Sequence, residues 1–233
     1  MRPTPAIQTR GLCKRFGPRL VLKAIDLEAA QGETIALMGA NGSGKTTLLR
    51  CLAGLSRPTA GEVCWFGHPA AAHVLARGLV GMVAHENALY PHLTAWENLI
   101  FAARMYGLPD PARRADELLC RFGLSAQAHG PAVRLSRGMR QRLALARAVI
   151  HEPRILLLDE PFSGLDAAGS ELLIDLLSDL RARERTVCLA AHDLQIAQRL
   201  AGRVLRLESG RLQPAATADA GVPPAASPLA RAA

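Results

Sequence analysis

Residues 39 to 47 carry the pattern that most limits what this chain can fold into. Their sequence, Gly-Ala-Asn-Gly-Ser-Gly-Lys-Thr-Thr, has the spacing G-x-x-x-x-G-K-[ST] and directly follows the apolar run 34–38. Such a loop needs a strand before it and a helix after it, which indicates an α/β fold. Glycines let backbone N–H groups curl around phosphate oxygens, so the expected ligand is a nucleoside triphosphate. The pattern also arises by chance in unrelated chains, so it needs support from other motifs.

The loop residues have distinct expected roles. The helix that begins near Lys45 points its positive end at the anion, and the Lys45 ammonium adds a full charge near the β and γ phosphates. Thr46 offers a hydroxyl group to Mg²⁺. The predicted nucleotide-binding residues of this loop are Gly39, Ala40, Asn41, Gly42, Ser43, Gly44, Lys45, Thr46 and Thr47.

Size and composition set limits on the class of protein. With 233 residues, 49% of them hydrophobic, the chain can bury the core of one substantial α/β domain or of two small lobes. It has no apolar run of about 18 residues, which a membrane-spanning helix needs. The first residues lack the apolar core of a signal peptide. We expect the protein in the cytosol or on the cytoplasmic face of the membrane.

The chain is basic, with a net charge of +8, but only 4% of its residues are aromatic. Basicity is compatible with nucleic acid, anionic lipid or a nucleotide ligand. No alternation of basic and aromatic residues predicts a base-stacking platform, so we favour a solvated arginine-rich surface and no nucleic-acid partner. The five cysteines are scattered without C-x-x-C spacing, which favours small buried side chains over a disulfide or zinc framework.

Turn residues and hydrophobic periodicity predict the remaining elements. Helix starts are expected at a capping box, Thr94 to Glu97, at Asp110-Pro111 and at Ser136. Gly11, Gly17-Pro18 and Gly32 are expected turns. The expected strands are 6–9, 22–27, 62–66, 155–158, 186–190, 204–207 and 211–212, and the other expected helices are 45–53, 167–183 and a short one after His192. The Ala/Pro-rich stretch 214–233 is expected to be a disordered tail after a domain of residues 1–213.

A second motif ends the apolar strand 155–158 with two carboxylates, Asp159 and Glu160. Such a strand delivers both groups to the carboxyl edge of a parallel sheet, beside the phosphate loop. Asp159 is placed to hold Mg²⁺, and Glu160 to orient or deprotonate an attacking water. Solvated acids at a strand end are the alternative reading of this pattern.

A third motif is Leu135-Ser136-Arg137-Gly138-Met139-Arg140-Gln141, at the start of a helix. Here the chain resembles the ATP-binding cassette family, whose signature is typically Leu-Ser-Gly-Gly-Gln. Leu135, Ser136 and Gly138 match, whereas Arg137 and Met139 depart. The hydroxyl of Ser136 and the free N–H groups of a helix start form an anion site. The resemblance implies that Ser136 and Gly138 complete the nucleotide pocket of a second subunit.

Other landmarks fall in the family's order over residues 6 to about 212. Phe16 fits the position of the aromatic that stacks on adenine, although a core position is the alternative. The segment 163–166, ending at Asp166, looks like the dimer-contact loop, and His192 matches the histidine that hydrogen-bonds the γ-phosphate. The resemblance implies a P-loop NTPase core with an N-terminal antiparallel β subdomain and an inserted α-helical signature subdomain at about 88–150. It also implies ATP hydrolysis with Lys45, Glu160 and His192 as catalytic residues.

One position departs from the family in a way that matters for the metal. The family usually has a glutamine at the end of the strand near residues 80–85, and this chain has none there. His85 or Glu86 occupies the position, depending on the alignment. Because Mg²⁺ prefers hard oxygen ligands, Glu86 is the better candidate to join Thr46 and Asp159 at the metal.

The resemblance implies a clamp of two cassettes, a homodimer or a heterodimer with another cassette, that sandwiches ATP. Closure would be passed to a separate integral membrane permease subunit through residues near 86–108. Residues 136–139, His85 and the segment 93–99 resemble the ATPase of heme export for cytochrome c maturation. An exporter of another cargo (drug, lipid or polysaccharide) and a soluble cassette ATPase of iron–sulfur cluster assembly are the alternatives.

Overall fold

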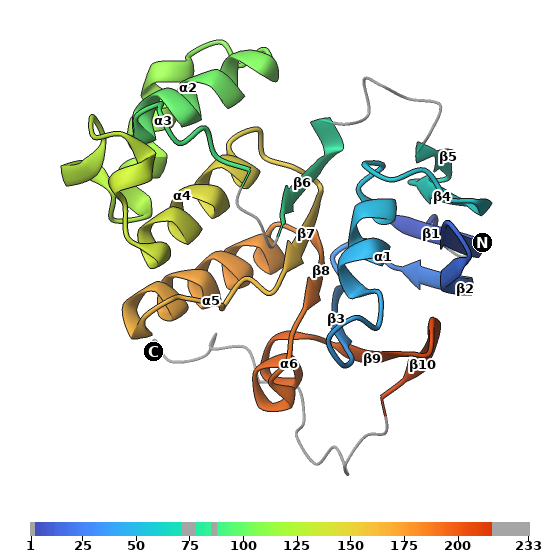
Figure 1. Cartoon of the computed structure of the whole chain (residues 1–233). Helices are drawn as coiled ribbons and strands as arrows, with labels where there is room; N and C mark the ends of the chain where they lie inside the picture. The colour runs from blue at the N-terminus through green and yellow to red at the C-terminus, as the bar shows by residue number, and fades with distance from the viewer. Residues whose placement is uncertain (1–2, 71–77, 85–87, 216–233) are drawn as a thin grey trace, which may run out of the picture.

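Two β-sheets of different construction organise the molecule (Figure 1). The computed structural model describes residues 3–70, 78–84 and 88–215. In the antiparallel sheet, strands β1 (Ile7–Phe16), β2 (Arg19–Ala29), β4 (Ala60–Trp65) and β5 (His68–Pro69) lie in the order β2-β1-β4-β5. The second sheet is parallel except for the hairpin of β9 and β10, and its order is β10-β9-β3-β8-β7-β6. Its strands are β3 (Thr34–Met38), β6 (Val80–Val83), β7 (Ile155–Asp159), β8 (Thr186–Ala190), β9 (Arg203–Glu208) and β10 (Arg211–Pro214).

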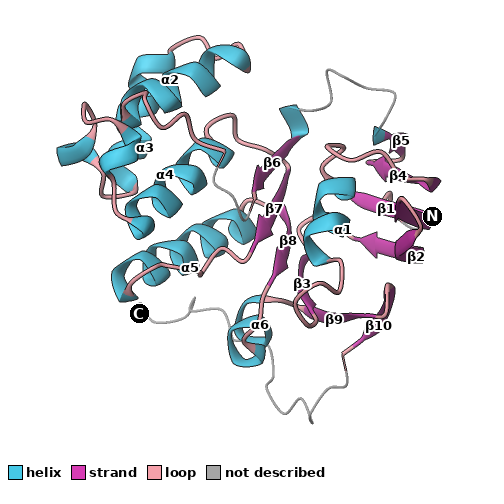
Figure 2. Cartoon of the chain, in the orientation of Figure 1, coloured by secondary structure: helices cyan, strands magenta, loops and turns pink. Residues whose placement is uncertain are grey.

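The helices pack on both faces of the parallel sheet (Figure 2). On one face, α1 (Lys45–Leu52) lies between this sheet and the antiparallel one. The other face is covered by the helices that follow β6 in the chain. They are α2 (Ala95–Met105), α3 (Pro111–Arg121), α4 (Arg137–Val149), α5 (Ala167–Ala182) and α6 (Leu194–Leu200), with 3-10 turns at Ser125–Gln127 and Ala132–Arg134. This is the predicted P-loop fold with an antiparallel β subdomain and an inserted helical one.

Each central strand serves two hydrophobic cores. In β7, Ile155 and Leu157 pack into the core around α1, while Leu156 and Leu158 pack into the core under the other helices. Side chains alternate between the two faces of a strand, so a strand covered on both faces is apolar throughout. This explains why the continuous apolar run 155–158 predicted a buried strand correctly.

The N-terminal strand is longer than predicted because Gly11 lies inside it. Gly11 has a φ of 55°, and the register of β1 against β2 shifts between Thr9 and Leu12, as in a β-bulge. The Gly11 N–H donates to Oδ1 of Asp26 at 2.6 Å, so it stays satisfied although it leaves the ladder. The expectation of a turn at Gly11 was therefore wrong, since a bulge uses the same glycine conformation.

The helix starts predicted from capping residues are confirmed. Thr94 and Glu97 form a full capping box at α2, Asp110 caps α3 with Pro111 in the first turn, and Ser136 caps α4. Asn98 adds a feature that the sequence did not indicate. It is fully buried, accepts from the Tyr90 N–H and donates to the carbonyls of Tyr90, Leu93 and Thr94, so it fixes the loop before α2.

Other expectations concern the C-terminal tail, residues 85 and 86, the cysteines and membrane-spanning helices. Strand β10 includes Pro214, so it runs one residue into the expected tail, of which residues 216–233 lie outside the described part of the chain. His85 and Glu86 also lie outside it. Cys51, Cys64 and Cys188 are buried as expected, but Cys120 is exposed on α3. None of the helices in the described residues has the length and apolar character that crossing a bilayer requires.

Candidate nucleotide site

Three neighbouring parallel strands end at the same edge of the sheet and carry the predicted site residues there. Strand β8 pairs with β3 on one side and with β7 on the other. In this register Leu37 of β3 and Asp159 of β7 both lie opposite Ala190. The phosphate loop, Glu160 and His192 follow these three strand ends directly, so the topology brings them together.

The loop after β3 adopts a shape that needs glycine. Gly39, Gly42 and Gly44 have φ values of 153°, 77° and 110°. A Cβ atom at Gly39 would lie 2.5 Å from the carbonyl oxygen of Leu207, and one at Gly44 would lie 3.1 Å from the side chains of Val21 and Leu22. Gly44 is also the N-cap of α1 and brings no side chain to the first N–H groups of the helix, which leaves them open to an anion.

Lys45 holds the loop in its present shape. Its ammonium donates to the carbonyl oxygens of Gly39 at 2.7 Å and Ala40 at 3.2 Å, and the residue is only 5% exposed. A triphosphate bound by the loop would compete with these carbonyl oxygens for the same charge, and a phosphate oxygen is the stronger partner because it is ionised.

A cavity of about 620 Å³ opens beside the loop. Its lining includes Glu160 and Phe16, which is 53% exposed and has the ammonium of Lys14 5.0 Å from its ring centroid. Phe16 is therefore a surface ring and not a core residue. The cavity lining also contains Asn41, Gly42, Gly44, Lys45, Thr46 and Thr47 from the predicted set.

Glu160 and His192 contact each other directly. Nε2 of His192 lies 2.5 Å from Oε1 of Glu160, and the backbone N–H of Glu160 donates to the carbonyl of Ala190. Glu160 has a φ of 52°, a conformation that non-glycine residues rarely adopt and that is typical of functional positions. The contact joins the ends of β7 and β8. His192 does not line the nucleotide cavity but a smaller hollow of about 310 Å³, which shares Glu160 with it.

The donor set beside the loop fits a magnesium ion. Asp159 is 1% exposed, yet neither of its carboxylate oxygens accepts a hydrogen bond from the described residues. The hydroxyl of Ser43 is likewise buried without a partner in this part of the chain. A buried carboxylate without a partner is costly, and carboxylate and hydroxyl oxygens are ligands that Mg²⁺ prefers. Among the described residues no group of three or more His, Cys, Asp or Glu side chains is arranged to hold a metal.

The remaining predicted residues lie elsewhere on the chain. The described residues that line the cavity do not include Ser136, Gly138 or Asp166. Ser136 Oγ accepts from the Met139 N–H at 3.2 Å, and Asp166 caps α5 by accepting from the Gly169 N–H at 2.8 Å. Gly138 packs against the segment of Asp166, because a Cβ there would lie 3.1 Å from the Gly164 carbonyl oxygen. These residues form a second group that does not line the nucleotide cavity of the same chain.

Comparison with known proteins identifies the architecture. The family model described as ABC transporter matches residues 22–163. The chain belongs to the ABC transporter family. It is an ATP-hydrolysing cassette of that family, and the predictions of fold and of enzyme class are confirmed.

Relatives of this cassette differ in what they are named for. The chain is 37% identical over 213 residues to the glutamine transport ATP-binding protein GlnQ of Escherichia coli, covering 88% of this chain and 89% of GlnQ. It is 38% identical over 212 residues to the Nod factor export ATP-binding protein I of Burkholderia lata, covering 90% of this chain and 70% of the relative. The dimeric post-hydrolysis structure of the cassette MJ0796 bound to ADP and Pi superimposes with a TM-score of 0.82 at 29% identity, covering 89% of this chain and 98% of that one.

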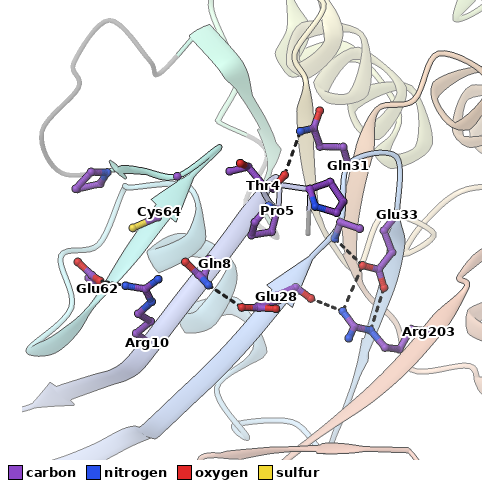
Figure 3. Close-up of a pocket in the computed structure, with 14 residues that line it drawn as sticks. Thr4, Pro5, Gln8, Arg10, Glu28, Gln31, Glu33, Glu62, Cys64 and Arg203 are labelled. Carbon is purple, nitrogen blue, oxygen red and sulfur yellow. Dashed lines mark hydrogen bonds and ion pairs between the residues drawn. The ribbon is translucent and has the colours of Figure 1, made fainter. Parts of the chain in front are cut away.

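The cassette has a larger cavity, of about 830 Å³, which Figure 3 shows on the antiparallel sheet. None of the loop residues 39–47 lines it. Its polar side chains bind one another. Arg203 pairs with Glu33 at 3.0 Å, and the amide of Gln8 donates to Glu28 at 2.6 Å. Arg10 and Glu62 form a further pair at 3.6 Å, so four of the five charged side chains among the described residues of this lining are in ion pairs, and we assign the chemistry to the smaller cavity beside the loop.

A third hollow lies where the helical subdomain meets the sheet. It has a volume of about 450 Å³, and its floor is β6 with the helices α2 and α4 beside it. Tyr90 and Tyr106, the only tyrosines of the sequence, both line it, together with the exposed Phe101 and Met105. Tyr90 meets Phe101 edge-to-face at 5.0 Å, and Tyr106 stacks on His151 at 3.7 Å. The lining also includes Arg147, whose guanidinium lies 5.5 Å from the ring centroid of Tyr90. We call this mostly apolar hollow the helical-subdomain groove.

Sequence reasoning missed two basic residues of the nucleotide cavity, Arg19 and Arg50. Arg50 lies four residues after Thr46 on α1, so helical spacing alone places it on the same face of the helix as the loop. Arg19 starts β2 two residues after Gly17, and its position beside Phe16 follows from the tight β1–β2 hairpin. Both signals were available in the sequence.

Proposed function

We propose that the cassette binds Mg-ATP in the cavity beside the phosphate loop and hydrolyses it with Glu160 as the base. The observation that carries this proposal is the meeting of β3, β7 and β8 at one edge, which puts Glu160 and the loop on one cavity. The loop N–H groups and Lys45 would hold the phosphates, and Phe16 would carry the adenine ring. His192 would reach the γ-phosphate, and its contact with Glu160 supports a shared site for both residues.

Thr46 and Asp159 would hold the magnesium ion, with Glu86 as a further candidate ligand. When bound, the ion would supply positive charge that neutralises the phosphate oxygens. Asp159 supplies a carboxylate that the described protein residues leave without a partner. We assign Glu160 to the attacking water and not to the metal, and it would take the proton of that water.

We propose further that two cassettes close around two ATP molecules. Ser136, Gly138 and Asp166 lie outside the nucleotide cavity of their own chain, as expected for groups that serve a second protomer. The related MJ0796 structure is dimeric. In this arrangement the free N–H groups at the start of α4 would face the γ-phosphate held by the partner cassette.

Replacement of the base tests the clamp. Glu160→Gln removes the proton acceptor but keeps the size of the side chain, so ATP should bind without being cleaved. We expect this variant to elute as a dimer with ATP and as a monomer with ADP, with turnover lowered by about 100-fold or more. Light scattering after gel filtration measures the mass. A variant that stays monomeric in ATP, or that still hydrolyses it at the wild-type rate, contradicts the proposal.

The helical-subdomain groove supports a membrane permease as the partner of the cassette. Its lining includes six residues of the region near 86–108 that was expected to contact this subunit, and it gathers aromatic and methionine side chains that favour binding to another protein. The protein would then be peripheral, on the cytoplasmic face of the membrane. This places ATP hydrolysis in one chain and the passage for the cargo in another.

We propose that the transporter exports its cargo, and that the cargo is heme for cytochrome c maturation. The support is the sequence resemblance at residues 136–139, at His85 and over 93–99. Deletion of the chain should abolish mature c-type cytochromes, and exogenous Glu160→Gln protein should not restore them. Normal cytochromes would refute heme export in favour of another exported cargo. Copurification with cluster scaffold proteins, in place of a permease, would support the iron–sulfur alternative.

A further inference from the structure

Arg137 links two segments that the sequence separates by 26 residues. It is the first residue of α4 and stands where the typical signature of the family has glycine. Its Nη2 donates to Oγ of Ser163 at 2.7 Å. The stem of the side chain lies over Gly164, where a Cβ atom would be 2.5 Å from Nε of Arg137. Arg137 therefore crosses from the start of the signature helix to the loop behind Glu160.

This loop, residues 160–166, begins with the proposed base. The Ser163 N–H donates to the carbonyl of Glu160 at 3.0 Å, so Ser163 and Glu160 belong to one turn. Helix α4 holds the turn at two points. Gln141, 6% exposed, donates to the Pro161 carbonyl at 3.0 Å, and the exposed Arg137 holds Ser163. The inner contact is shielded from water, whereas the outer one can open.

We propose that Arg137 is a positioning residue for ATP hydrolysis. By holding Ser163 it fixes the turn that sets the backbone of Glu160, and so the approach of the Glu160 carboxylate to the phosphate loop. The inference rests on the role proposed for Glu160. Arg137 is not among the described residues that line the nucleotide cavity of its own chain. In the proposed clamp the start of α4 meets the partner's nucleotide through backbone N–H groups, which a side-chain substitution keeps, so we expect loss of the Arg137 side chain to act on the chemical step.

The Arg137 side chain suits this contact because its stem covers Gly164 and its planar guanidinium places an N–H donor beyond that residue, at Ser163. A lysine keeps the charge but presents it as a compact, mobile ammonium. Ser163 is the acceptor, so its replacement by alanine breaks the same contact from the other side. Two variants therefore report on one hydrogen bond by separate routes.

The test compares steady-state ATP hydrolysis by the full chain and its variants. Arg137→Ala and Ser163→Ala should each lower kcat by about 5- to 10-fold, the effect of one lost hydrogen bond at the protein surface, with KM within about twofold of wild type. The double variant should lose no more than either single one, since both remove one contact. Arg137→Lys should recover part of the rate.

The matched control is Arg113→Ala. Arg113 is an exposed arginine in the first turn of α3 that pairs with Glu117 at 3.1 Å, and its loss should leave kcat and KM unchanged. Thermal unfolding of the Arg113 and Arg137 single variants should match wild type, because both residues are exposed.

Three results would overturn the inference. One is an unchanged kcat in Arg137→Ala, and another is a raised KM at constant kcat, which would make Arg137 a direct ligand of the nucleotide of a second protomer. The third is losses that multiply in the double variant, which would mean separate roles for the two residues.

Glu160→Gln in the same assay separates the two proposals. If it keeps the wild-type rate, the role of Glu160 fails, whereas a silent Arg137→Ala beside an inactive Glu160→Gln removes only the inference.

Discussion

At the residue scale, Asp159 shows a conflict between folding and function. Its carboxylate is buried at 1% exposure without a partner among the described residues, which destabilises the ligand-free protein. This cost is offset only if the carboxylate gains a favourable interaction when a cation binds to the site. The same arrangement would explain why the strand 155–158 ends in an acid when every residue before it is apolar.

We therefore expect Asp159→Asn to be more stable than wild type without ligand, by about 1–3 kcal/mol, because a neutral amide replaces an unpaired charge. Its Mg²⁺-dependent turnover should fall by about 100-fold or more, since the metal loses its carboxylate ligand. Urea unfolding and ATPase assays measure the two effects. Asp175→Asn, an exposed acid on α5, is the control and should change neither. An Asp159→Asn variant less stable than wild type would contradict this explanation.

At the scale of elements, the capping box of α2 gives a pH-dependent contribution to stability. The Thr94 N–H and hydroxyl both donate to Glu97 at 2.8 Å, and the backbone bond is the main cause that lowers the pKa of Glu97 below its usual value. A lowered pKa in the folded state means that the contribution is complete above the usual value and is lost as pH falls through the folded value.

Thr94→Ala should accordingly lower the free energy of unfolding by about 1 kcal/mol at neutral pH. The destabilisation caused by Glu97→Ala should shrink as pH falls from 6 to below about 4, where the carboxylate is protonated. Urea unfolding across this range measures both. Glu171→Ala, on the exposed face of α5, should show a difference that pH leaves constant. A Glu97 effect that grows in acid would show that the cap does not act through its charge.

Local patterns predicted the elements well, because caps, glycines and apolar runs act over a few residues. The strand 155–158, the cap at Asp110 and the helix start at Ser136 are examples. What escaped prediction is contact between distant segments. Nothing near Arg137 indicates Ser163, and nothing near Asn98 indicates that its amide closes a preceding loop. Gly11 failed for another reason, since a turn and a bulge need the same positive φ.

The candidate site also contains residues that the sequence predicted and a contact between them that it did not. The phosphate loop, Asp159 and Glu160 were readable because each follows a strand, and topology then brings parallel strand ends together. The side-chain contact between His192 and Glu160 was not readable, because it depends on β8 lying between β3 and β7. Strand order is a property of the whole sheet and is not written in any single strand.

At the scale of the whole molecule, the helical-subdomain groove should govern partner binding without affecting the chemistry. Met105 is 71% exposed there, so Met105→Glu puts a charge into an apolar contact. We expect the variant to lose binding to the permease by about 10-fold or more while the isolated chain keeps its wild-type ATPase rate. Pull-down with the permease in detergent measures binding.

The matched control is Val133→Glu, at a residue that is 55% exposed and lies outside the groove lining. It should bind the permease like wild type. Equal binding by the Met105 and Val133 variants would remove the groove as the docking face. A loss of ATPase rate in isolated Met105→Glu would show that the groove and the chemistry cannot be separated in this way.

Strand β6 forms the floor of this groove, and in the ladder Val83 lies opposite Leu158, one residue before Asp159. Adjacent strands are about 4.8 Å apart. Gly81 fits so tightly that a Cβ would lie 2.2 Å from the Ala148 carbonyl oxygen, which leaves this strand little freedom to move alone. A partner that pushes on the groove would thus displace β6, and the adjacent strand β7 carries Asp159 and Glu160 at its end. The displacement would reach the acid pair directly, without a long chain of contacts through the protein.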